Sequence, residues 1–209
     1  MNPPVTSPLQ RILARACDIQ SHEVRATLAS FTLVLVLMGS YYILRPVRDA
    51  MASDWSDAEV SWLWTFTFIF STIAVSLYGA AVARIHTRHL VPAVYTFFAG
   101  SFLLFYLGTQ TLADRVLLDK CFYVWISLFS LFHISVFWSF MADTFSKPQA
   151  TRLFGFIGAG ASIGAIAGPA FAALLVGGLG TDPLQLVASA LIVVTLPIIL
   201  LLQRLKSTD

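Results

Sequence analysis

Charged residues are scarce in this chain: only 11% of its 209 residues are Asp, Glu, Lys or Arg, while 57% are hydrophobic. A typical soluble domain is about 25% charged. A surface so poor in charge would not stay in solution, so the composition excludes a soluble globular protein. It indicates an integral membrane protein whose main partner is the lipid bilayer.

Cysteine and excess charge are also missing. The two cysteines, Cys17 and Cys121, stand far apart, which gives neither metal-ligand spacing nor a disulfide framework. The formal net charge is only +2, and the basic residues sit at the ends of apolar segments. The sequence therefore predicts no metal, no cofactor and no nucleic acid partner.

What the chain does contain is six apolar segments of about 20 residues, which suit helices crossing a ~30 Å bilayer core and not the ~10-residue strands of a barrel. Their expected limits are 26–44, 59–83, 90–110, 121–142, 153–176 and 184–202. The fold class is thus all-α, with a six-helix membrane domain over 26–202 and tails at 1–25 and 203–209. The periodicity from Leu9 to Cys17 predicts an amphipathic helix on the membrane surface; a partly ordered tail is the alternative.

Local patterns mark several helix ends. Capping boxes at Ser56–Glu59 and Ser146–Gln149 predict the starts of the second and fifth helices. Pro46 is the predicted end of the first helix, and Pro169 is predicted to close the glycine-rich helix of the fifth segment, although the apolar residues continue to about 176. Asp182 followed by Pro183 has the pattern of an N-cap and first helical residue.

The basic residues predict an orientation. If the N-terminus is cytoplasmic, the outer loops hold only four basic residues: Arg45, Arg48, Arg115 and Lys120. The inner segments hold nine: Arg11, Arg15, Arg25, Arg84, Arg88, Lys147, Arg152, Arg204 and Lys206. The excess favours both termini in the cytoplasm.

Three glycines in the fifth span, Gly160, Gly164 and Gly168, recur every four residues and share one helix face. Small residues at that spacing let membrane helices approach closely, so we expect this face, with Pro169, to pack on a neighbour. The stretch also contains the G-x-S-x-G pattern around Ser162. No histidine follows Ser162, so the sequence argues against an intramembrane serine protease, and we expect no enzyme.

The first span ends in YYILRPVRDA, in which Tyr41 is placed for an interfacial aromatic belt. Arg45 has two interpretations: it reaches the outer headgroups, or it faces a central cavity and attracts an anionic substrate. Arg48 pairs with Asp49 or with a loop acid in the first interpretation.

His133 lies about twelve residues into the fourth span, near the membrane midplane. An ionisable residue at that depth is a functional candidate, and histidine can relay a proton near neutral pH. The alternative is a neutral histidine satisfied by a neighbouring hydroxyl.

Asp143, Lys147 and Arg152 surround the loop after the fourth span. They form either a solvated loop with local ion pairs or, for Asp143 and Arg152, part of a cytoplasmic gate with Arg84 or Arg88.

Three segments carry a resemblance: YYILRPVRDA, FWSFMADTF and QATRLFGFIGAGASIGAIAGP. Together they resemble the N-terminal half of bacterial relatives of the nucleotide (ATP/ADP) translocases, which belong to the major facilitator superfamily. The resemblance covers about 23–202, and Gly164-x-x-x-Gly168-Pro169 is similar to an antiporter motif. The turn after the second span departs from the superfamily pattern, with Ala83 at its acidic position and His86 at its second glycine.

The resemblance implies alternating-access transport across a bacterial inner membrane, with spans one, two, four and five beside the pathway. The candidates for substrate binding or the pathway are Tyr41, Arg45, Arg48, Asp49, His133 and Trp138. The substrate would be a nucleotide or another organic anion. The alternative is a non-transporting membrane scaffold or an inactive remnant of a transporter.

Three crossings invert the chain, so two similar triplets of helices would be related by inverted topology, as within each half of these transporters. The family has twelve spans and six are expected here. A C-terminal half or a second copy of this chain is therefore an expected partner, with the Gly160–Gly168 face among the possible contacts of a homodimer.

Overall fold

A computed structural model describes residues 19–206, which form six α-helices and no strand. The helices are α2 (Val24–Ala52), α3 (Asp57–Val82), α4 (Thr87–Thr111), α5 (Val116–Thr144), α6 (Lys147–Leu179) and α7 (Pro183–Lys206). All six are long and apolar enough to cross a membrane. The predicted all-α membrane fold is confirmed, while the amphipathic helix expected over 9–17 lies outside the described residues.

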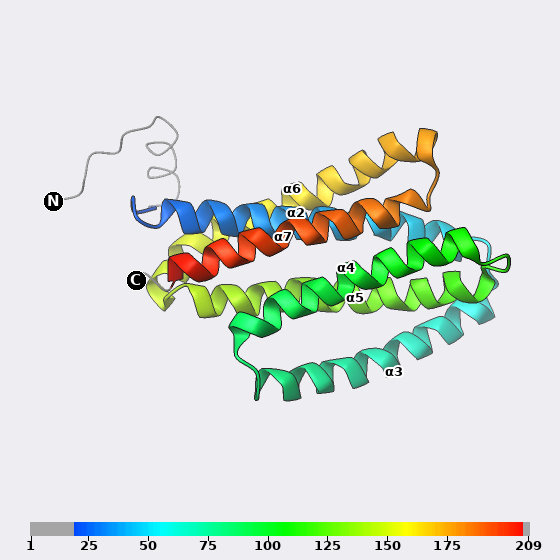
Figure 1. The fold of residues 1–209 in the computed structure, drawn as a ribbon, viewed down its shortest axis with the longest axis horizontal. Coiled ribbons are helices and arrows are strands. Elements are labelled where there is room, and N and C mark those ends of the chain that lie inside the picture. Colours follow the sequence, from blue (N-terminus) through cyan, green and yellow to red (C-terminus); the bar gives the residue numbers. More distant parts are fainter. Residues whose placement is uncertain (1–18, 207–209) are drawn as a thin grey trace.

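Successive helices run in opposite directions, so the helix ends gather on two sides of the bundle (Figure 1). We call the side that holds Glu23, the α3–α4 turn and Lys206 the terminal side, because both ends of the described chain lie there. The opposite side, which holds the α2–α3, α4–α5 and α6–α7 connections, is the far side. A six-helix bundle of this kind has alternating crossings, and its second triplet runs inverted with respect to its first.

The predicted capping boxes form. The Ser56 hydroxyl accepts a hydrogen bond from the Glu59 N–H at 3.4 Å, and the Glu59 carboxylate accepts from the Ser56 N–H at 3.0 Å. Gln149 likewise accepts from the Ser146 N–H at 2.9 Å. Both boxes stand at helix starts, which fixes where α3 and α6 begin.

The two proline boundaries were predicted wrongly. Helix α2 continues through Pro46 to Ala52, and α6 continues through Pro169 to Leu179. A proline removes one helix hydrogen bond, but unravelling the helix in lipid would leave many more backbone groups without partners. Both helices are therefore longer than the sequence suggested.

The helices pack in a pattern that repeats between the two triplets. Helices α2 and α5 contact each other, α6 packs on α2, and α3 packs on α5, while α4 and α7 pack together and cover both central helices. Exchanging α2, α3 and α4 with α5, α6 and α7 maps these pairs onto one another. In Figure 1, α7 and α4 lie in front of α2 and α5.

The glycine face of α6 lies against α2. A Cβ atom on Gly160 would stand 2.6 Å from the Phe31 carbonyl oxygen, and one on Gly168 would stand 2.8 Å from that of Gly39. A Cβ on Gly164 would overlap the carbonyl oxygen of Leu35. The two backbones are thus as close as glycine alone permits. The chain's own α2 therefore covers the face that the sequence placed among the possible contacts of a homodimer.

Helix α3 is the most exposed element, since Leu63 is its only buried residue. It packs mainly on α5 and leaves an apolar cavity of about 740 Å³ between itself, α4 and α5. Phenylalanine, leucine and tryptophan side chains line this cavity almost throughout. Such a surface suits contact with lipid tails.

Candidate substrate pathway

A cavity of about 440 Å³ with an arginine and several hydroxyl groups in its lining lies between α2, α3 and α5, toward the far side of the bundle. It stands out because the surrounding helices are almost wholly apolar. The residues that line it are Arg48, Trp64, Thr67, Phe68, Ser71, Tyr123, Ser127 and Leu131.

Arg48 is the only charged side chain in the lining of this cavity. Its Nε and Nη2 atoms donate to Oδ1 of Asp49 at 2.9 and 2.6 Å, and Nη1 donates to the Ser127 hydroxyl at 3.2 Å. The guanidinium carbon stands 5.3 Å from the Tyr123 ring centroid, and the side chain is 17% exposed. A guanidinium has five N–H donors, so Arg48 keeps donors for an anion in the cavity.

Hydroxyl groups from α3 add hydrogen-bonding capacity. The Thr67 and Ser71 hydroxyl oxygens are buried and have no hydrogen-bond partner among residues 19–206. The Trp64 indole N–H donates to the Tyr123 hydroxyl at 2.8 Å. Buried polar groups usually find partners. A polar ligand could satisfy these two hydroxyls only if their side chains turned toward the cavity that they and Arg48 line.

Arg45, for which the sequence left a headgroup and a cavity interpretation open, lies outside this cavity lining. Its side chain is 46% exposed, and its Nε stands 3.8 Å from Asp49 Oδ2. Its guanidinium carbon lies 5.6 Å from the Tyr42 ring centroid. Asp49 thus faces both arginines, and Arg48 rather than Arg45 borders the cavity.

His133 is buried between α5 and α2. Its ring stacks on Tyr41 with a centroid separation of 4.8 Å, Nδ1 lies 3.0 Å from the Phe129 carbonyl oxygen, and Nε2 lies 3.3 Å from the Met38 sulfur. The contacts are with a carbonyl and a sulfur, not with the hydroxyl expected from the sequence. A neutral ring that donates from Nδ1 fits them.

Trp138 lies in a different place from Arg48. Its ring packs against Phe137 and, across the helix interface, against Phe154 of α6, with centroid separations of 5.0 and 5.2 Å. The six pathway candidates therefore divide into an arginine group at the far end of α2, a Tyr41–His133 contact in the centre and an aromatic contact between α5 and α6.

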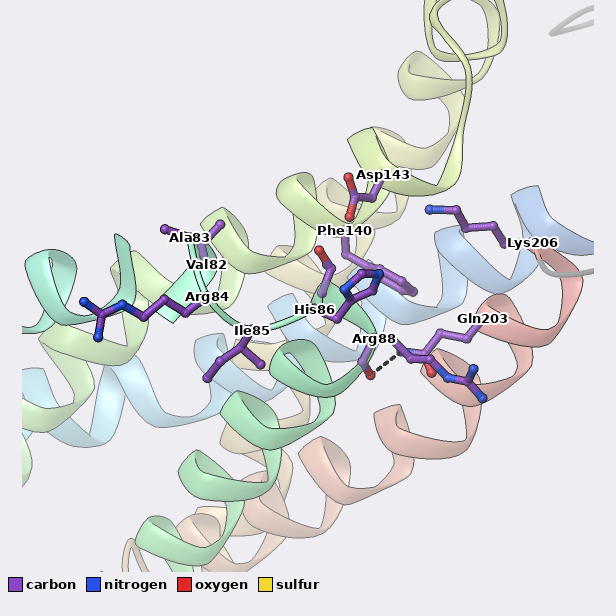
Figure 2. Close-up of a pocket in the computed structure, with 11 residues that line it drawn as sticks. Val82, Ala83, Arg84, Ile85, His86, Arg88, Phe140, Asp143, Gln203 and Lys206 are labelled. Atoms are coloured by element: carbon purple, nitrogen blue, oxygen red, sulfur yellow. Dashed lines mark hydrogen bonds between the residues drawn. The ribbon is translucent and has the colours of Figure 1, made fainter. Parts of the chain in front are cut away.

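The four gate candidates also separate. Arg84, Arg88 and Asp143 line one cavity on the terminal side, shown in Figure 2. Arg152 instead forms a bidentate ion pair with Glu23, with Nη2–Oε1 and Nη1–Oε2 distances of 2.8 and 3.1 Å. The structure does not bring Arg152 to Asp143, because Glu23 at the start of α2 holds it.

Five residues of these sites were not singled out in the sequence. Thr67, Ser71, Tyr123 and Ser127 line the Arg48 cavity, and Glu23 pairs with Arg152 on the terminal side. Thr67 and Ser71 did carry a signal, because hydroxyls four residues apart share one face of an apolar helix. Ser127 carried none, since serine is common in membrane helices.

No family model, curated protein sequence or solved structure matches this chain. Within residues 19–206 no group of three or more His, Cys, Asp or Glu side chains could hold a metal ion. Any function must therefore be argued from the arrangement of the residues themselves.

Proposed function

We propose that this protein is a six-helix transporter unit of the major-facilitator type that moves an organic anion, with nucleotides as the first candidates. The observation that carries the proposal is the polar cavity at Arg48. A guanidinium fork suits phosphate and carboxylate groups, and a cation inside an apolar bundle is costly to keep without a role.

The helix arrangement supports the same function. Helices α4 and α7 cover one side of α2 and α5, which leaves the other side, flanked by α3 and α6, for the pathway. Inverted triplets around a central site are the usual build of secondary transporters. A second six-helix unit, either a C-terminal half or another copy, would complete the pathway on that uncovered side.

Uptake of labelled ATP, ADP and smaller organic anions into proteoliposomes tests the proposal. We expect Arg48→Ala to lower uptake by roughly tenfold to a hundredfold, the usual effect of losing a hydrogen bond to a charged group. Uptake by Arg48→Lys should lie between that of wild type and that of Arg48→Ala, because lysine keeps the charge but lacks the forked guanidinium.

Arg115→Ala is the matched control. Arg115 is also a basic residue on the far side, but it pairs with Asp182 at 2.6 Å and does not line the Arg48 cavity. Uptake by the Arg115→Ala variant should stay within about threefold of wild-type uptake, because an exposed ion pair contributes little. Absence of flux from the wild-type protein over the whole panel would favour a non-transporting scaffold or an inactive remnant.

A further inference from the structure

A second cavity, of about 560 Å³, lies on the terminal side, between the α3–α4 turn and the ends of α5 and α7. Its charged lining is mainly basic: Arg84 and Arg88 come from the turn and from α4, and Lys206 comes from α7. Asp143 is the one acidic residue in the lining. The Gln203 side chain donates to the Arg88 carbonyl at 2.8 Å, which ties α7 to the start of α4 (Figure 2).

No carboxylate within residues 19–206 forms an ion pair with the cations of this cavity. Arg84, Arg88 and Lys206 make no ion pair with any residue in the range 19–206, and Asp143 makes none either. The far side differs, because each of its four basic residues has a carboxylate partner within 4.0 Å. These residues are Arg45, Arg48, Arg115 and Lys120. The terminal-side cavity therefore contains cations that have no carboxylate partner among residues 19–206.

Helix α4 adds charge of the same sign. It begins beside this cavity at Thr87, its first turn contains no acidic residue, and the His86 side chain does not cap it. A helix start has a partial positive charge that favours anions. In Figure 2 the Arg84 and Arg88 side chains extend in opposite directions from this segment, so their positive charge is spread along the cavity.

The rim of the cavity is apolar and exposed. Val82 and Ile85, which flank Arg84 in the turn, are 44% and 46% exposed. They stand at or just beyond the end of α3, a helix long and apolar enough to cross a membrane. A ligand that suits both the cations and this rim carries a phosphate and an apolar tail.

We propose that the terminal-side cavity binds the phosphate group of an anionic lipid headgroup. Arg84, Arg88 and Lys206, which line the cavity, supply the positive charge around the phosphate, and Val82 and Ile85 contact the upper part of the acyl chains. Basic pockets between membrane helices commonly hold such headgroups. The proposal does not depend on transport, because none of these residues lines the Arg48 cavity.

Native mass spectrometry of the full chain in a neutral detergent, titrated with phosphatidylglycerol, tests this inference. The Arg84→Gln/Arg88→Gln variant should bind the lipid roughly thirtyfold more weakly than wild type, given what two cations near an anionic lipid usually contribute. The control variant, Arg25→Gln/Lys147→Gln, removes two cations from the same side but outside this cavity.

Each outcome decides the matter. Weak binding by the first variant alone, with no comparable binding of phosphatidylcholine, supports the site. Equal loss in both variants would mean attraction by net charge only and would overturn it. Thermal unfolding with inorganic phosphate gives a second measurement: stabilisation equal to that by phosphatidylglycerol at the same concentration would overturn the assignment to lipid. Lys206→Gln, at the edge of the described chain, should weaken lipid binding in the same direction.

Discussion

Glu23 is a nearly fully buried acid, with a side chain 2% exposed, at the start of α2. Burial by itself raises the pKa of Glu23, but the hydrogen bonds from Arg152 and the Gln20 N–H outweigh burial and lower it. An acid with a lowered pKa in the folded state stabilises the fold above its unfolded-state pKa. That stabilisation is lost as the pH falls through the folded-state value.

We therefore expect Glu23→Gln to lower the free energy of unfolding at pH 7 by about 1.5–3 kcal/mol, the usual worth of hydrogen bonds to a charged group. The wild-type protein should lose this advantage as the pH falls below the ordinary glutamate value of 4.5. Denaturant unfolding in detergent at several pH values measures both effects. Asp54→Asn, at an exposed far-side acid, serves as control, and an equal loss in this variant would contradict the role of Glu23.

For single residues, the sequence indicated which side chains were candidates for a site but not which partners they contact. The Arg-Pro-x-Arg-Asp segment indicated arginines near an anion site, yet it could not distinguish Arg45 from Arg48. The distinction depends on which side of α2 meets α5, where Tyr123 and Ser127 are found. The sequence also did not predict the partner of Arg152, because that partner, Glu23, lies 129 residues away along the chain.

Among the elements, α2 and α6 form the closest pair. The glycine spacing predicted a packing face on α6, and the structure lays α2 along it. The partner could not be predicted, since a stripe of small residues accepts a helix of the same chain or of another copy. The helix ends predicted at the prolines were wrong because the rules for helix ends describe soluble proteins. There, backbone groups freed at a helix end bind water, which the bilayer core does not supply.

The glycine face gives a prediction with a matched control in the same helix. Gly164→Ala should destabilise the protein by roughly 1–3 kcal/mol, the usual cost of overpacking, because the new Cβ would overlap the Leu35 carbonyl oxygen. A Cβ at Gly158 meets nothing within 4 Å, so Gly158→Ala should be neutral or stabilising by up to about 1 kcal/mol. Unfolding of both variants in the same detergent would show the difference, and equal stabilities would contradict the close contact.

On the scale of the whole molecule, charge separates the two sides of the bundle. The described far side contains seven acidic and four basic residues, and the terminal side contains seven basic and two acidic residues. The number of spans and their approximate positions followed from hydropathy alone. The pairing of α2 with α6 and of α4 with α7 did not, because all six helices are similarly apolar and nothing local selects a distant partner.

The charge difference predicts the orientation. In a background with Cys17→Ser and Cys121→Ser, an impermeant maleimide added to intact cells should label Asp54→Cys on the far side. It should not label Lys147→Cys, on the terminal side, until the membrane is permeabilised, because the basic side is expected in the cytoplasm. Labelling in the reverse order would place both termini outside.

The α2–α6 contact also has a consequence for how the protein is made. The two helix segments that form this contact, around Gly39 and Gly164, leave the ribosome at different times. At a synthesis rate of ~5–20 residues per second, roughly 6–25 s separate them. During that interval α2 is already in the bilayer, or held by the insertion machinery, without the helix that packs on it most closely. Its nascent form would expose Gly39 and the neighbouring backbone to lipid or to a holding factor. Early termination of synthesis before α6 should therefore yield a product that is inserted but unprotected, and so readily degraded.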